Sequence, residues 1–149
     1  MSIIRSGKTN EGLQTYPIVA SKREEVASDK YMTTEATLYR NGRLVVDVYT
    51  DNDNFWHALR GHVLVILRDK DGKEIGVTGE LSCSFRGSSS GWESSSGTDI
   101  FTLQFPEEIA GRVVALDIHQ KDGRSPGNHF NKLVNALTHV GAVIAVGVV

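Results

Sequence analysis

The sequence predicts a mainly β fold, an antiparallel β-sandwich of about seven strands with one C-terminal amphipathic helix and an apolar terminal segment. Two observations indicate strands: runs rich in β-branched residues flank short turn signals, and later segments alternate apolar with polar side chains. A third indicates the helix, because apolar residues near the C-terminus recur at helical spacing. The 149 residues suit one domain of this kind.

Residues 1–33 are polar, carry glycine and lack sustained periodicity. We expect them to form an N-terminal arm that is extended or depends on assembly for its order. A short helical turn is predicted at residues 21–30, where Ser21 and Asp29 are residue types that cap helices. The remaining residues, 34–149, are expected to form the single β-sandwich domain with its C-terminal helix.

The pair Asn41-Gly42 separates two β-rich runs, ATLYR and RLVVDV, and is a strong hairpin signal. A two-residue turn would place Tyr39 opposite Leu44. Tyr39, Leu44 and Val46 would then share the core face of the hairpin.

Further strands are predicted by turn chemistry and alternation. A second hairpin joins HVLVILR to KEIGVTG through the polar turn 69–72. Pro106 ends a later strand because proline cannot donate to a ladder. The strands expected after the first hairpin are residues 62–68, 73–79, 99–105 and 112–120, and residues 80–85 either continue the second arm of the second hairpin or form a separate strand.

The C-terminal region combines a helix with an uncharged tail. Asn128 is the predicted N-cap, and the helical stripe comprises Phe130, Leu133, Val134, Leu137 and Val140. Residues 142–149, AVIAVGVV, are rich in β-branched side chains and predict a buried terminal strand. Such a tail is expected inside the fold, inside a subunit interface or against lipid. The candidate assembly residues are Val143, Ile144, Val146 and Val148.

Charge and cysteine content limit the partners and the compartment. The formal net charge is −2 with no Lys/Arg block, which predicts no nucleic-acid partner. The single cysteine excludes an internal disulfide, and the N-terminal residues lack the apolar stretch of a secretory signal. We therefore expect a protein that is cytoplasmic as synthesised, with signal-less export left open. No apolar run is long enough to span a bilayer, so any membrane contact would be superficial.

The stretch GSSSGWESSSG, residues 87–97, resembles a flexible linker but contains a tryptophan. Folded back, Trp92 would bury its ring and pin the loop to the sheet. Projected outward, Trp92 with Glu93 would bind a ligand, a partner or a lipid surface. We take both residues as candidate binding residues.

The stretch DNDNFWH, residues 51–57, places oxygen-bearing side chains next to two aromatic rings and an imidazole. Carboxylates and amides can bind sugar hydroxyls while an aromatic face stacks on the sugar ring. The alternative is a loop that bonds its own backbone, with the aromatics closing one end of the sandwich. The candidate ligand residues are Asp51, Asp53, Asn54, Trp56 and His57.

The predicted structure around each candidate catalytic or metal-binding motif does not fit that motif. Ser89 lies in a G-x-S-x-G match, but the strand-to-helix turn that this motif requires is absent. The calcium-loop-like start at Asp69 fits a polar hairpin turn better, and the five histidines have no zinc spacing. Cys83 alternates with apolar neighbours and is expected to be a buried, small apolar side chain. The sequence thus predicts no catalytic residue, no metal and no cofactor.

Together these patterns favour a non-enzymatic interaction module, self-assembling as a homo-oligomer or binding a protein partner through surface loops and the apolar C-terminus. One alternative is a lectin-like module that binds a glycan through the loop aromatics and Asp/Asn side chains. Another is a membrane-active protein that touches lipid through the Trp92 loop and the C-terminal tail.

Overall fold

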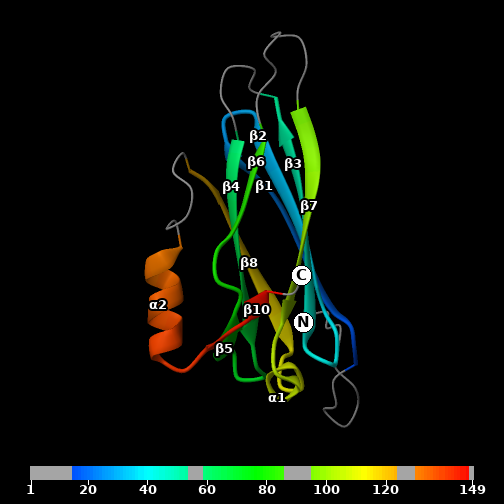
Figure 1. Cartoon of the computed structure of the whole chain (residues 1–149), viewed down its shortest axis with the longest axis vertical. Coiled ribbons are helices and arrows are strands. Elements are labelled where there is room, and N and C mark those ends of the chain that lie inside the picture. The colour runs from blue at the N-terminus through cyan, green and yellow to red at the C-terminus, as the bar shows by residue number, and fades with distance from the viewer. Residues whose placement is uncertain (1–14, 54–58, 86–94, 124–129, 148–149) are drawn as a thin grey trace.

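The computed structural model describes residues 15–53, 59–85, 95–123 and 130–147 (Figure 1). These ranges contain ten strands and two helices, and the antiparallel, mainly β character predicted from the sequence is confirmed. In chain order the elements are β1 (Ile18–Ala27), β2 (Lys30–Leu38), β3 (Arg43–Asn52), β4 (Leu59–Arg68), β5 (Glu74–Val77), β6 (Leu81–Phe85), β7 (Ser95–Gln104), α1 (Glu107–Ala110), β8 (Ala115–Asp122), α2 (Asn131–His139), β9 (Val143–Ile144) and β10 (Val146–Gly147).

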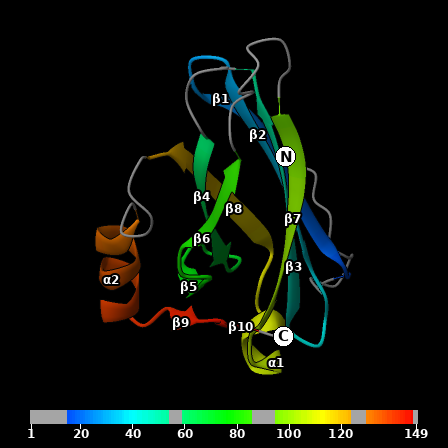
Figure 2. The same cartoon turned by 45° about the horizontal axis from the view of Figure 1, so that its top comes forward.

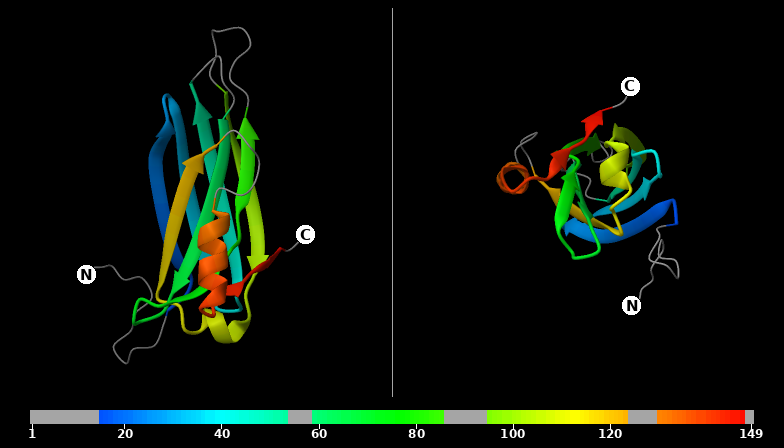
Figure 3. Two further views of the ribbon diagram at one scale, coloured as in Figure 1. Left: turned by 90° about the vertical axis from the view of Figure 1, so that its left-hand side faces the viewer. Right: turned by 90° about the horizontal axis from the view of Figure 1, so that it is seen from below.

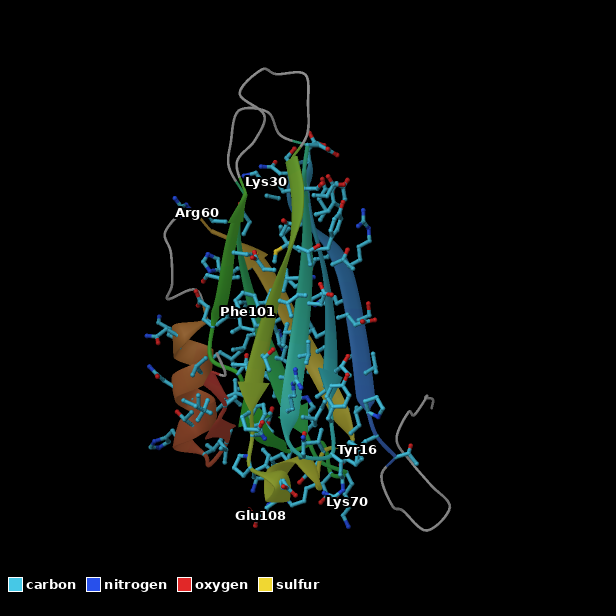
Figure 4. The ribbon with its side chains drawn as sticks, turned by 45° about the vertical axis from the view of Figure 1, so that its right-hand side comes forward. Tyr16, Lys30, Arg60, Lys70, Phe101 and Glu108 are labelled. Carbon is cyan, nitrogen blue, oxygen red and sulfur yellow. The ribbon has the colours of Figure 1, made fainter. Side chains whose placement is uncertain are left out.

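The first sheet has the order β1-β2-β3-β7-β10, with every neighbouring pair antiparallel (Figure 4). Alternation gives it two different faces: Met32, Thr34, Ala36 and Leu38 of β2 are buried, whereas the residues that alternate with them are partly or fully exposed. Successive side chains of a strand point to opposite faces, so one face of this sheet is apolar and directed inward.

The second sheet is built around β4. β8 pairs with one edge of β4, and β6 and β5 pair with successive parts of the other edge. β9 then adds to β5 in parallel at Gly76 and Val77. Residues 62–67 of β4 are all buried, because the strand is covered on both faces, and this explains its continuous apolar run.

A single hydrophobic cluster joins the inward faces of the two sheets. Leu44, Val46 and Val48 come from the first sheet, and Val63, Val65 and Leu67 from the second. Phe105, which follows β7, is the largest of the fully buried side chains in this cluster. The core therefore lies between the sheets.

Helix α2 covers the outer face of the second sheet (Figure 3). Phe130 and Leu137 are buried against Leu64, Ile66 and Val77 in a second, smaller apolar cluster. Asn128, the predicted N-cap, lies outside the described residues. The N-cap position is Phe130, which makes no side-chain cap hydrogen bond; its backbone N–H donates to Glu80 Oε1 at 2.7 Å. The one-turn helix α1 lies where the sequence predicted only a connection.

The first hairpin differs from the prediction by one residue. Leu44 is the partner of Leu38, not of Tyr39, because the turn is longer than two residues: Gly42 N–H donates to Tyr39 O, and Tyr39 N–H to Arg43 O. Gly42 has φ +93°, as in a type I turn followed by a left-handed residue. A one-residue shift moves a side chain to the opposite face, so Tyr39 is exposed and Leu38 takes the core position.

The described part of the predicted N-terminal arm is extended and belongs to the first sheet. Residues 18–27 form strand β1, which pairs with β2, so the short helical turn predicted at 21–30 is wrong, and the predicted boundary at residue 33 falls inside β2. Pairing with β2 outweighs the local tendency of these residues toward a helix. Lys22 Nζ also donates to Ile118 O of β8 at 3.2 Å, so β1 is tied to both sheets.

The C-terminal segment connects the two sheets (Figure 2). Ala145 N–H donates to Val77 O at 3.0 Å beyond the β9–β5 pairing, and β10 then pairs with the end of β7. In place of one buried strand there are two strands of two residues each.

Candidate functional site

The strands that flank the two predicted loop sites are paired at one end of the sheets. Asn52, the last residue of β3, is the register partner of Ser95, the first of β7. Leu59 at the start of β4 pairs with Phe85 at the end of β6. We call this the Lys30 end, after the labelled side chain that lies there in Figure 4. The structure thus brings the strands on either side of both predicted sites to one end of the molecule.

The Ser/Gly-rich stretch ends as a strand. Residues 95–97 are the start of β7 and pair with residues 50–52 of β3. The strand predicted at 99–105 therefore begins four residues earlier than expected. Thr50 Oγ1 also donates to the carbonyl oxygen of Gly97, its register partner, at 3.4 Å.

Two of the predicted ligand residues are described. Asp51 is half-buried in β3 between Tyr31 and Ser96, and Asp53 is exposed, with its N–H donating to Asp29 O at 2.8 Å. The other predicted loop residues, Asn54, Trp56, His57, Trp92 and Glu93, lie outside the described residues. Binding of a glycan at these positions therefore stays a prediction.

Buried polar side chains at the Lys30 end were missed by sequence reasoning. Thr34 Oγ1 donates to Gln120 Oε1 at 2.6 Å, and Gln120 Nε2 donates to Glu24 Oε1 at 3.1 Å. Lys30 Nζ lies 3.7 Å from Asp122 Oδ2. These contacts join β1 and β2 of one sheet to β8 of the other. A signal existed: Thr34 is in phase with the inward apolar residues of β2.

His62 belongs to the arrangement in the described ranges that most resembles a catalytic group. Its Nδ1 lies 2.9 Å from Glu80 Oε2 and 3.1 Å from Ser82 Oγ. A serine relay requires the hydroxyl and the carboxylate on different ring nitrogens, and here both contact the same one. Because Glu80 also accepts the Phe130 N–H, the group ties β4 and the residues before β6 to the start of α2.

An ionic network lies on the outer face of the second sheet. Arg68 donates through Nη1 to Glu74 and through Nη2 to Asp117, each at 2.9 Å, and His119 Nε2 lies 3.3 Å from Asp117 Oδ2. Burial acts to raise the pKa of Asp117, but the Arg68 hydrogen bond and the charges of His119 and Arg68 hold it below its usual value. The network joins β4 to β5 and β8.

Cys83 is buried, as the alternation of its strand predicted. Burial, with the nearby charge of Asp99, raises the pKa of the Cys83 thiol to about 12. A thiol with this pKa is almost wholly protonated at neutral pH and is a poor nucleophile.

We expect Cys83 in the folded chain to react with a thiol reagent such as DTNB at pH 8 at least about a hundredfold more slowly than in urea-unfolded chain. The reason is the small thiolate fraction together with the loss of access. Absorbance at 412 nm follows the reaction, and the unfolded chain is the control. Similar rates in both states would contradict the buried position.

The C-terminal segment exposes its large side chains and buries its small ones. Val140, Ile144 and Val146 are 62%, 47% and 68% exposed, whereas Ala142 and Ala145 between them are buried. We call these three residues the C-terminal strip. Of the other predicted assembly residues, Val143 is half-buried against the main core, and Val148 lies outside the described residues.

Within the described ranges, no group of three or more His, Cys, Asp or Glu side chains could hold a metal ion. No helix in those ranges is both long enough and apolar enough to cross a bilayer. No protein-family model matches the chain, and no curated protein or solved structure shows significant similarity to it.

Proposed function

We propose that this chain is a non-enzymatic interaction module, an antiparallel β-sandwich that associates with a second copy of itself through the C-terminal strip. The observation that carries the proposal is the exposure of Val140, Ile144 and Val146 on a segment that already bridges the two sheets.

The burial pattern of this segment suggests that its exposed large side chains contact a partner and do not stabilise the fold. A segment selected only to close the fold would direct its valines and isoleucine inward, since burying each contributes about 1.5–3 kcal/mol. Here the buried positions hold Ala142 and Ala145, and only Val143 of the larger side chains packs partly against the core. Clustered exposed apolar side chains are typical of interaction surfaces, whereas single ones need no explanation.

A further exposed apolar side chain lies on the strand next to β10. Val146 is the register partner of Gln104, so the two side chains share the outer face of the first sheet. Ile100 lies four residues before Gln104 on the same face and is 64% exposed. Val146 and Ile100 are therefore exposed apolar side chains on one face of the first sheet, with Thr102 and Gln104 between them.

The test is the solution mass of the full chain, measured by size exclusion with light scattering over a range of concentrations. We expect a dimer. Replacing Ile144 and Val146 together by lysine should raise its dissociation constant at least about tenfold, because unpaired charges would be buried in the interface. Val19→Lys is the matched control, because Val19 is also an exposed apolar residue, at 44%, but lies on the opposite edge strand.

A wild-type chain that is monomeric at all concentrations would contradict the proposal. A monomer that binds liposomes, and loses that binding in the Ile144→Lys, Val146→Lys variant, would instead assign the strip to lipid contact. Equal weakening by Val19→Lys would show that the effect is not specific to the strip.

A further inference from the structure

The outer face of the first sheet groups an exposed tyrosine with carboxylates. Tyr49 of β3 is 40% exposed, and Asp47 and Asp51 lie two residues before and after it on the same face. Glu35 of β2 is exposed on this face and is the register partner of Asp47, so it lies diagonally across from Tyr49. We call these four residues the Tyr49 face.

Two of these carboxylates oppose each other without compensation. Glu35 and Asp47 are register partners, and like charges directly opposite each other on a sheet are destabilising. Neither side chain forms an ion pair or a hydrogen bond within the described ranges. Arg43, the basic residue of β3, is four residues from Asp47, about 14 Å along the strand, where physiological salt screens most of the attraction. Residues that break a rule of folding in this way are typical of functional sites.

The same face already holds one guanidinium group. Arg23 of β1 lies over the ring of Tyr31, with Cζ 5.1 Å from the ring centroid, and its Nη1 donates to Thr33 Oγ1 at 3.1 Å. A cation over the face of an aromatic ring is attracted by the quadrupole of the ring. Thr33 is also the register partner of Tyr49, so the two tyrosines share this neighbour. No described arginine or lysine lies over the ring of Tyr49, which leaves this exposed ring to a cation from outside the chain.

We infer that the Tyr49 face binds an extended basic segment of another protein, with arginine or lysine side chains at alternate positions. Charge complementarity supports a cationic partner, because three carboxylates surround the tyrosine. The spacing supports an extended partner, since Asp47, Tyr49 and Asp51 follow one another about every 7 Å, the interval between side chains on one face of a β-strand. A second copy fits poorly, because this chain has a formal net charge of −2. The inference goes beyond the proposed function and does not depend on it.

The experiment measures the binding of two labelled peptides to the full chain by fluorescence anisotropy. The peptides are TRTRTRT and TTRRRTT, which have the same composition and charge but differ in the spacing of their arginines. At about 50 mM salt, where surface charges are only weakly screened, we expect TRTRTRT to bind at least about threefold more tightly. Equal affinity of the two peptides would overturn the inference, because net charge alone would then explain the binding.

Variants of the chain locate the binding surface. Glu35→Gln with Asp47→Asn should weaken the binding of TRTRTRT at least about fivefold. Glu107→Gln with Glu108→Gln is the matched control, since it removes the same charge from exposed positions of α1 and should change the affinity less than about twofold. Tyr49→Leu should weaken binding about two- to fivefold, whereas Tyr49→Phe keeps the ring and should bind like the wild type.

Three further results would overturn the inference. Equal weakening by the two double variants would show that the peptide responds only to the net charge of the chain. A lower urea midpoint for Glu35→Gln with Asp47→Asn would show that the opposed carboxylates stabilise the fold, whereas relief of their repulsion predicts an equal or higher midpoint. Binding of spermine as tight as that of TRTRTRT, with loss in the same variants, would assign the face to a free polyamine.

Discussion

Gly42→Ala is expected to lower the free energy of unfolding by about 3 kcal/mol. Gly42 has φ +93°, a conformation that side-chain-bearing residues rarely adopt. A Cβ at this position would also overlap the carbonyl oxygen of Phe105 and lie 2.9 Å from Gln104 Nε2. Neither neighbour can withdraw freely, because Phe105 N–H donates to Gly42 O at 2.9 Å and Gln104 Nε2 donates to Asn41 O at 2.8 Å.

Urea denaturation of the variant and the wild type measures this loss. Gly72→Ala is the matched control: Gly72 has φ +78° in the other hairpin turn, and a Cβ there would meet nothing within 4 Å. That variant should lose only the left-handed strain, about 1–2 kcal/mol. Equal losses in the two variants would show that the contact with Phe105 contributes nothing.

Phe105→Ala is expected to destabilise the chain by about 3–5 kcal/mol, the range for removing a fully buried aromatic ring from a core. Phe105 is buried between the sheets in the main cluster. Its ring packs so closely on β5 that a Cβ added at Gly76 would lie 2.9 Å from Phe105 Cε1. The surrounding strands belong to both sheets and cannot collapse into the space without breaking ladders.

Phe105→Leu keeps the measurement possible if the alanine variant does not fold, and should lose clearly less stability. Phe101→Ala is the control from strand β7, which directly precedes Phe105, since Phe101 is only half-buried against the same core. Thermal unfolding followed by circular dichroism ranks the three variants. A loss for Phe101→Ala as large as for Phe105→Ala would contradict the central position of Phe105.

Much of the fold could be predicted because its strongest signals are local. The turn 69–72 forms as expected, with Asp69 Oδ1 accepting the N–H groups of Asp71 and Lys73 at 2.9 and 3.0 Å. The turn residues Asn41-Gly42 predicted the position of the first turn but not its length. Because the turn is one residue longer than predicted, Leu38 and not Tyr39 lies in the core. Turn residues specify the allowed backbone conformation, while packing between the sheets selects the register.

The candidate site was predictable only in part, because a sequence does not show which strands meet. Thr34 and Gln120 are 86 residues apart and form one buried hydrogen bond. The polar segment at 21–25 contains no apolar alternation, yet it is a strand because β2 and β8 offer it partners. In both cases the stabilising contact is long-range.

By itself, the sequence determined that the chain is mainly β, that its strands are joined by tight turns, and that Cys83 is buried. Periodicity and turn chemistry are properties of neighbouring residues, so they are readable without a fold. Only the tertiary structure decided the order of the strands in the first sheet and which side chains of the C-terminal segment face outward. Those properties depend on the neighbouring strands. Ala145 donates a backbone hydrogen bond to Val77 of β5 and is buried, whereas Val146 pairs with β7 and is exposed.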